Sequence, residues 1–138
     1  METVIFACVH NAGRSQMAAA FFNALADGSR ARAISAGTQP AAAVHPEVVQ
    51  VMQEAGIDLR ERKPQRLTAE LARGAALLVT MGCGEECPAV PGVPRADWPL
   101  PDPKGKDRDD ARRIRDEVRR LVLALIEREG WARPAGDR

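Results

Sequence analysis

The hydrophobic pattern near the start of the chain changes from that of a strand to that of a helix. Residues 3–7 form an apolar run rich in β-branched and aromatic side chains, which predicts a short buried strand. From Ser15 onward, apolar residues recur every four positions, which predicts a helix. The segment 8–14 therefore connects the carboxyl end of a strand to the amino end of a helix.

The rest of the chain continues this alternation. Three further strands are predicted, at residues 31–36, 75–80 and, within a proline-rich stretch, 95–98. Three further helical segments are predicted, at residues 46–55, 68–73 and 107–129. Strands separated by helices pair through right-handed crossovers, so the sequence predicts one α/β domain over residues 1–138 with a parallel sheet covered on both faces. Ligands of such sheets bind beyond the carboxyl ends of the strands, where segment 8–14 lies.

The last predicted helix has an apolar side and a charged side. Its apolar face is expected to consist of Ile114, Val118, Leu121, Val122, Leu125 and Ile126. On the charged, exposed side, Asp109 and Arg113 stand four residues apart, as do Asp116 and Arg120. This charge density indicates a solvated face rather than a binding patch.

The overall charge and the cysteine content narrow the class of protein. The formal net charge is +1 over 138 residues, which gives no electrostatic footprint for nucleic acid or a membrane surface. The first apolar run is too short for a signal peptide or a membrane span, so we expect a cytoplasmic protein. Three cysteines cannot form a closed set of disulfides. In a reducing compartment such cysteines are more often catalytic, redox-active or metal-binding.

The segment from Cys8 to Ser15 has the composition of an oxyanion-binding loop. Gly13 allows a tight curl, so that backbone N–H groups and the positive end of the helix dipole surround an anion. Arg14 adds a planar, bidentate clamp, and the same field favours the nucleophilic thiolate form of Cys8. We expect both residues in a surface cradle rather than the core. The alternative is a buried cysteine with a surface arginine six residues later.

Ser15 has two predicted roles in this loop. Its hydroxyl either caps the following helix or donates to the sulfur of Cys8, and one residue can do both.

A second cysteine segment, with Cys83 and Cys87, follows the strand predicted at 75–80 and so emerges at the same sheet edge as Cys8. In an ideal helical turn these two Cβ atoms would stand about 5–6 Å apart, which is too far for a disulfide. The flanking Gly82, together with Gly84 and Pro88, favours a turn that can rearrange, and this indicates a redox switch. The alternatives are half of a zinc site, which lacks a familiar second pair of ligands, or two structural thiols.

A stiff, proline-rich loop carries Asp102. Because the flanking prolines reduce the ordering cost, this carboxyl group is a candidate general acid for an oxygen that leaves the central atom of the oxyanion. The alternative is that Asp102 and Pro103 only initiate a turn.

Four motifs in order give the chain a family resemblance. The Cys8 to Ser15 loop, the Ser-Ala-Gly-Thr stretch at 35–38, the cysteine segment and the loop around Asp102 together resemble the arsenate reductases built on the low-molecular-weight tyrosine phosphatase fold. This family implies a three-layer α/β fold in which a four-stranded parallel sheet is flanked by helices. It also implies reduction of arsenate to arsenite, with thioredoxin as the regenerating partner in many members. We expect no cofactor and no metal, because the potassium site of some members uses an acidic residue early in the first helix, which this chain lacks.

The resemblance also implies a role for each site residue. Cys8 would attack arsenic, Asp102 would protonate the departing oxygen, Cys83 would attack the Cys8 adduct, and Cys87 would then attack Cys83. The substrate-binding residues would be Val9, His10, Asn11, Ala12, Gly13, Arg14 and Ser15, with Asn11 bracing the loop.

Three alternatives stay open on the sequence alone. Some relatives with a short spacing between the second and third cysteines use a low-molecular-weight thiol, so the reductant is either thioredoxin or a small-thiol system. A tyrosine phosphatase would use the same loop, but it would leave Cys83 and Cys87 without a function and usually carries tyrosines, of which this chain has none. A non-catalytic arsenical sensor would not need the oxyanion clamp.

Overall fold

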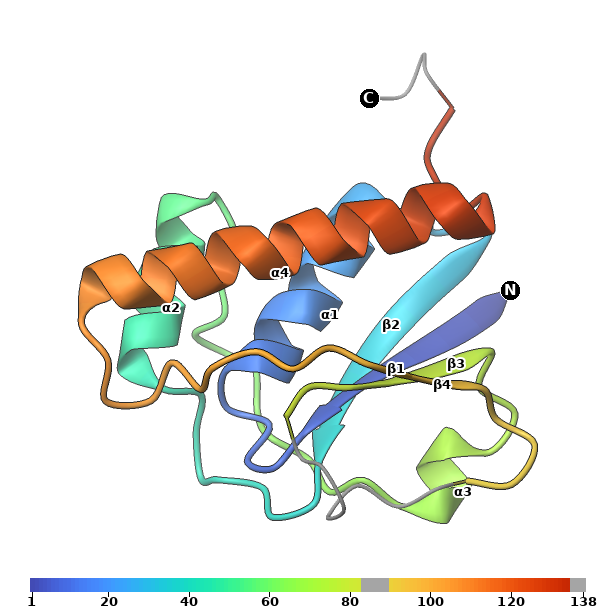
Figure 1. Cartoon of the computed structure of the whole chain (residues 1–138), viewed down its shortest axis with the longest axis horizontal. Coiled ribbons are helices and arrows are strands. Elements are labelled where there is room, and N and C mark those ends of the chain that lie inside the picture. The colour runs from blue at the N-terminus through green and yellow to red at the C-terminus, as the bar shows by residue number, and fades with distance from the viewer. Residues whose placement is uncertain (83–89, 135–138) are drawn as a thin grey trace.

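A computed structural model describes residues 1–82 and 90–134 of the chain (Figure 1). Its elements match the predicted order of strands and helices. They are β1 (Glu2–Cys8), α1 (Arg14–Leu25), β2 (Ala31–Gly37), α2 (Pro46–Glu54), α3 (Ala69–Ala72), β3 (Leu77–Thr80), β4 (Arg95–Asp97) and α4 (Arg108–Glu129).

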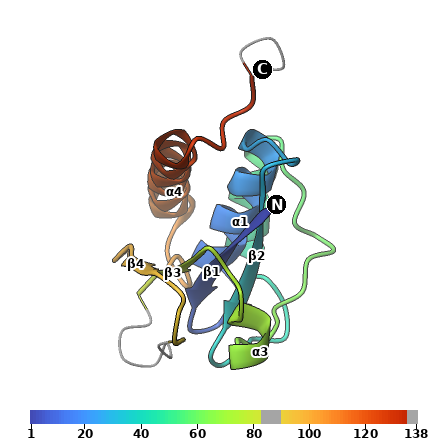
Figure 2. The same cartoon turned by 90° about the vertical axis from the view of Figure 1, so that its right-hand side faces the viewer.

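The strands form a parallel sheet in the order β2-β1-β3-β4 (Figure 2). The register places Cys8 beside Gly37, and Thr80 lies beside both Ala7 and Asp97. The carboxyl ends of all four strands therefore meet at one edge. The prediction of a four-stranded parallel sheet flanked by helices is confirmed.

The two faces of β1 pack against different parts of the molecule. Val4 and Phe6 belong to the larger core, which includes residues of α1, α2 and α4. Ile5 and Ala7 belong to a smaller core, which includes Ala72 of α3. Figure 1 shows α4 running along α2 and α1, whereas α3 lies on the other side of the sheet. A strand buried on both faces explains why the sequence of β1 is a continuous apolar run.

The ends of α4 follow ordinary capping rules. The Asp107 side chain accepts a hydrogen bond from the Asp110 amide, and Gly130 ends the helix in the left-handed conformation. Five of the six predicted apolar residues are buried, and Leu121 is only partly buried. Within the described part of the chain, no helix combines the length and apolarity needed to cross a membrane.

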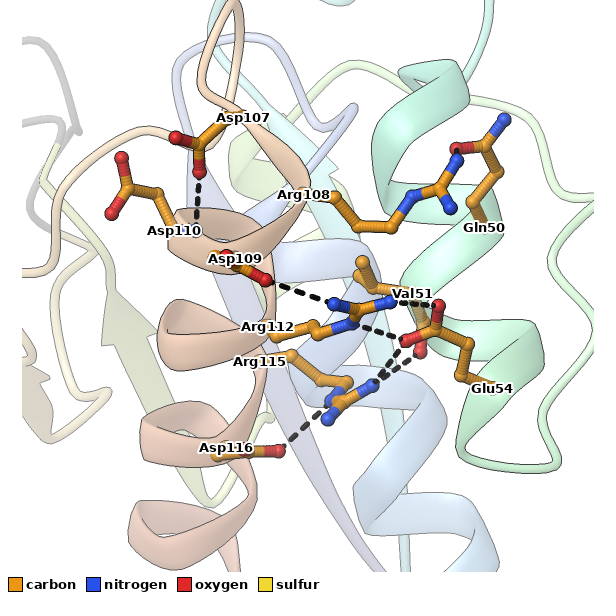
Figure 3. A network of polar contacts seen from close by, with 10 residues as sticks. All are labelled: Gln50, Val51, Glu54, Asp107, Arg108, Asp109, Asp110, Arg112, Arg115 and Asp116. Carbon is orange, nitrogen blue, oxygen red and sulfur yellow. Dashed lines mark hydrogen bonds and ion pairs between the residues drawn. The ribbon is translucent and has the colours of Figure 1, made fainter.

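Ion pairs join α4 to α2 (Figure 3). Arg112 donates to both carboxylate oxygens of Glu54 at 2.8 Å, and Arg115 donates to the Val51 carbonyl at 2.8 Å. Hydrogen bonds from Arg112, with help from its charge and that of Arg115, lower the pKa of Glu54 from its ordinary value of 4.5 to about 2. The charged side of α4 is therefore partly an interhelical contact and not wholly a solvated face.

Two arginines on α4 pair with a carboxylate other than the one that stands four residues before them. Arg113 pairs with Asp110 and Arg120 pairs with Glu117, in each case three residues apart rather than four. Both spacings place side chains on the same side of a helix, so the sequence pattern does not choose between them.

Candidate active site

The loop between β1 and α1 turns its carbonyl groups outward. Six consecutive carbonyls accept hydrogen bonds from groups outside the curl: Cys8 from Thr38 N, Val9 from Gln39 N, His10 from Ala41 N, Asn11 from Gln16 Nε2, Ala12 from His45 N and Gly13 from Met17 N. Within residues 1–82 and 90–134, the N–H groups of residues 9–13 donate to no protein acceptor. This arrangement leaves the donors for a ligand inside the curl, as an anion-binding nest requires.

Asn11 fixes the shape of this loop. It is fully buried and has a left-handed backbone with φ of 50°, a conformation that asparagine tolerates better than most residues. Its side-chain oxygen accepts from the Gln65 backbone N–H at 2.9 Å and from Gln16 Nε2 at 3.3 Å. Because a backbone N–H can only donate, it fixes which end of the Asn11 amide is the oxygen.

This orientation favours one direction for the hydrogen bond between Ser15 and the Cys8 sulfur. The Asn11 Nδ2 group donates to Ser15 Oγ at 2.7 Å, and Ser15 Oγ lies 2.9 Å from Cys8 Sγ. Since Ser15 Oγ accepts from Asn11, its own proton is available for the sulfur. Ser15 makes no capping hydrogen bond in α1, so of its two predicted roles the structure has the contact with Cys8.

Cys8 and Arg14 are more deeply placed than the sequence predicted. Cys8 is 2% exposed and belongs to the larger core, and Arg14 is 7% exposed. The expectation of a surface cradle was therefore wrong for both residues. The outward-turned carbonyls attach the loop to neighbouring segments, which accounts for its burial.

The Arg14 guanidinium is held by the loop that follows β4. Its Nη1 donates to the Leu100 carbonyl at 2.8 Å, and its Nη2 lies 3.8 Å from Asp102 Oδ2. The Nε group is buried and has no hydrogen-bond partner among the described residues. A buried guanidinium donor of this kind is suited to an oxyanion.

Asp102 combines the two interpretations that the sequence left open. Its Oδ1 accepts from the Lys104 backbone N–H at 3.0 Å, which is the hydrogen bond of a turn. Its Oδ2 faces Arg14, and its side chain is 40% exposed. The structure thus brings Asp102 beside the guanidinium of the same loop that carries Cys8.

The remaining predicted site residues are Cys83 and Cys87, which lie outside the described residues. Within residues 1–82 and 90–134, no group of three histidine, cysteine or carboxylate side chains is placed to hold a metal ion. The predicted relay between the three sulfurs therefore stays a prediction.

Comparisons with known proteins identify the family. The model of the low molecular weight phosphotyrosine protein phosphatases matches residues 3–130. The chain belongs to this family. An arsenate reductase of Brevibacillus brevis is 34% identical over 91% of this chain and 95% of its own length.

Solved structures of arsenate reductases have a fold similar to that of this chain. A thioredoxin-dependent arsenate reductase of Corynebacterium glutamicum is 36% identical with a TM-score of 0.78, and the match covers 92% of this chain and 61% of that one. A structure described as an arsenate reductase in the oxidized state is 30% identical with a TM-score of 0.80, covering 93% and 98% of the two chains. The resemblance to the arsenate reductases with the low-molecular-weight phosphatase fold is confirmed.

Several residues that hold the site in place were not predicted from the sequence. Gln16 and Gln65 hold Asn11, and the Leu100 carbonyl holds Arg14. Gln16 is only 4% exposed. Its position directly before a run of six apolar residues could have indicated that its polar side chain is buried and needs a partner. Gln65 and Leu100 act through backbone atoms, so their side-chain types gave no signal.

Proposed function

We propose that the chain is an arsenate reductase, in which Cys8 is the nucleophile and Cys83 and Cys87 form a disulfide relay that thioredoxin regenerates. The observation that carries the proposal is the loop of residues 8–15. Its carbonyls face outward, its sulfur accepts from Ser15, and a buried Arg14 donor has no protein partner. The names of its relatives support the same activity.

The first step uses the geometry of this loop. The backbone N–H groups of residues 9–13 and the Arg14 guanidinium bind the arsenate oxygens, which places arsenic above the Cys8 sulfur. The Cys8 thiolate attacks arsenic, and one oxygen leaves as water after accepting a proton from Asp102. This step forms a bond between sulfur and arsenic(V) without a change of oxidation state.

The next steps transfer two electrons. The Cys83 thiolate attacks the Cys8 sulfur, and the electron pair of the sulfur–arsenic bond remains on arsenic, which leaves as arsenite. The product is a Cys8–Cys83 disulfide. The Cys87 thiolate then attacks Cys83, which frees Cys8 and forms a Cys83–Cys87 disulfide. A dithiol such as thioredoxin supplies the two electrons that restore the thiols.

The aromatic residues favour a small inorganic substrate over an aryl phosphate. The sequence contains three phenylalanines, two tryptophans and no tyrosine. The phenylalanines are buried, Trp98 packs on Phe6 with ring centroids 5.6 Å apart, and Trp131 packs on Phe22 at 5.9 Å. The three phenylalanine rings are buried in the core, and the two tryptophans are partly buried and pack against it. The chain has no tyrosine that an aryl phosphatase on this loop could stack on its substrate.

The test is multiple-turnover reduction of arsenate by the purified protein. One arm supplies thioredoxin, thioredoxin reductase and NADPH, and a parallel arm supplies a small thiol with glutaredoxin. We expect turnover with thioredoxin. Turnover with the small thiol and glutaredoxin alone would show that the protein uses a small-thiol system as its reductant instead. Robust hydrolysis of aryl phosphates without arsenate reduction in either arm would contradict the proposal in favour of a phosphatase.

Two variants and one control accompany this assay. Cys8→Ser and Arg14→Ala are each expected to abolish turnover, because the first removes the nucleophile and the second removes the oxyanion clamp. Arg119→Ala changes an exposed arginine of α4 and should leave turnover unchanged. Substantial arsenite production by Cys8→Ser would exclude the mechanism.

A further inference from the structure

Gly82 is the second residue after β3. Its environment is unusual for a glycine with positive φ. Among the described residues, six glycines have φ between 72° and 85°, namely Gly56, Gly74, Gly82, Gly92, Gly105 and Gly130. At five of them a side chain would extend into open space. At Gly82, a Cβ atom would overlap Nη1 of Arg14 and would lie 3.3 Å from its Cζ and 3.4 Å from the Leu100 carbonyl oxygen.

The Arg14 guanidinium therefore occupies the space that a side chain at position 82 would need. The same Nη1 atom donates to the Leu100 carbonyl at 2.8 Å, so the atom that fills this space also makes that hydrogen bond. Gly82 has φ of 85°, which by itself favours glycine, but backbone conformation does not require the contact with Arg14. The two observations are independent reasons for glycine at this position.

We propose that Gly82 is a positioning residue for Arg14 in the proposed arsenate reduction. Because Gly82 has no side chain, Nη1 can reach the Leu100 carbonyl. This hydrogen bond orients the guanidinium so that its buried Nε group is left for the oxyanion. Gly82 also directly precedes Cys83 in the sequence. The start of the segment that carries the second cysteine thus lies against the anion-binding arginine.

A methyl group at position 82 should displace the arginine rather than unfold the protein. The atoms that it would crowd are Nη1 and Cζ of Arg14, at the end of a flexible side chain that can move, whereas the backbone oxygen of Leu100 lies at an ordinary contact distance of 3.4 Å. Once displaced, Nη1 loses its bond to Leu100 and the guanidinium no longer presents a fixed edge to the ligand. A hydrogen bond that involves a charged group is worth roughly a tenfold or larger change in affinity.

The experiment compares Gly82→Ala with Gly74→Ala. Gly74 lies just before β3, has φ of 79°, and has open space where a side chain would be, so it reproduces the backbone strain without the contact. The dissociation constant of inorganic phosphate is measured by calorimetry, and KM and kcat are measured with arsenate. We expect about a tenfold or larger rise in the dissociation constant and in KM for Gly82→Ala only, with a similar fall in thermal midpoint for both variants.

A double-mutant cycle with Arg14→Lys tests whether the effect acts through Arg14. Lysine has no Nη1 group, so Gly82→Ala should weaken phosphate binding in the native background but not further in the Arg14→Lys background. An equal loss in both backgrounds, or equal phosphate affinity in Gly82→Ala and Gly74→Ala, would overturn the proposal. The dissociation constant of phosphate can be measured without turnover. A protein that fails to reduce arsenate would therefore contradict the proposed function, but the role of Gly82 would still be tested by phosphate binding.

Discussion

Asn11 and Ser15 lie four residues apart across the loop, and the amide of Asn11 donates to the hydroxyl of Ser15 at 2.7 Å. The consequence is a directed chain of hydrogen bonds. The Gln65 backbone N–H orients the amide, the amide donates to the hydroxyl oxygen, and the hydroxyl proton is left for the Cys8 sulfur. The Cys8 sulfur, which is buried, thus has a side-chain donor at 2.9 Å.

Asn11→Asp tests this chain with almost no change of shape. A carboxylate cannot donate, so the Ser15 hydroxyl should turn toward residue 11 and the sulfur should lose its donor. Loss of a hydrogen bond to a charged group costs about 1.5–3 kcal/mol, or roughly 10–100-fold in rate. We expect at least this loss in kcat, together with slower alkylation of Cys8 by iodoacetamide at neutral pH.

Ser15→Ala is the matched control for Asn11→Asp. It removes the same donor but adds no negative charge, so its loss should be no larger than that of Asn11→Asp. Alkylation of Cys8 is best followed with Cys83 and Cys87 both replaced by serine, so that one thiol reacts. Unchanged alkylation in Asn11→Asp would mean that Ser15 does not donate to the sulfur.

The relay predicts different stalled states for the two outer cysteines. Cys87→Ser should complete one round of chemistry and stop as a Cys8–Cys83 disulfide, because Cys83 can still resolve the adduct. Cys83→Ser should stop earlier, before efficient release of arsenite. Peptide mapping under non-reducing conditions after a single turnover distinguishes these states. No Cys83–Cys87 bond in the native protein, together with full turnover in Cys87→Ser, would show that the third cysteine is structural.

Gly13 sets the spacing between the loop and the segment that carries Asp102. A Cβ atom at position 13 would lie 2.9 Å from Cγ of Pro103 and 3.3 Å from its Cδ. Gly13→Ala should therefore push Pro103, and with it Asp102, away from the loop. We expect a fall in kcat for arsenate that exceeds the loss of phosphate affinity, because Asp102 acts on the leaving oxygen.

Pro103→Ala removes the atoms that would clash with residue 13. The double variant Gly13→Ala with Pro103→Ala should therefore recover part of the kcat that Gly13→Ala loses, as measured by single-turnover release of arsenite. No recovery in the double variant would place the cause in the conformation of the loop itself rather than in its contact with Pro103.

The ion pair between α2 and α4 predicts a stability change in acid. The pKa of Glu54 is about 2 in the folded protein and 4.5 ordinarily, so the folded state binds fewer protons between these values. The contribution of Glu54 is fully present above about pH 4.5 and is lost as the pH falls toward 2. Glu54→Gln should thus have a lower thermal midpoint than the native protein at neutral pH, and the difference should vanish near pH 2.

This comparison contains its own control. Asp58, whose pKa is also lowered to about 2 by hydrogen bonds from Arg60, is present in both proteins and cancels in the difference. A difference between the thermal midpoints that stays constant down to pH 2 would mean that Glu54 stabilises the helices by packing rather than by charge.

The sequence predicted the parts of the site that depend on residues close together in the chain. The apolar run at residues 3–7 and the helical period from Ser15 placed Cys8 and Arg14 in the segment that connects strand and helix, and in the structure Cys8 ends β1 and Arg14 begins α1. The sequence did not predict that Asn11 is held by Gln65, 54 residues away, or that Arg14 is held by Leu100. Each contact joins a side chain of residues 8–15 to a backbone atom of a distant segment, and no local pattern of residue types records it.

The bond between Arg14 and Leu100 spans 86 residues and has a consequence for folding. The oxyanion site is incomplete until the segment after β4 has docked, so an unfolded or partly folded chain cannot offer the same clamp to a ligand. A ligand that binds only the native state stabilises it by mass action, by about 2.7 kcal/mol at one hundred times its dissociation constant. The substrate oxyanion thus protects the fold, and the protein resists unfolding most when its substrate is abundant.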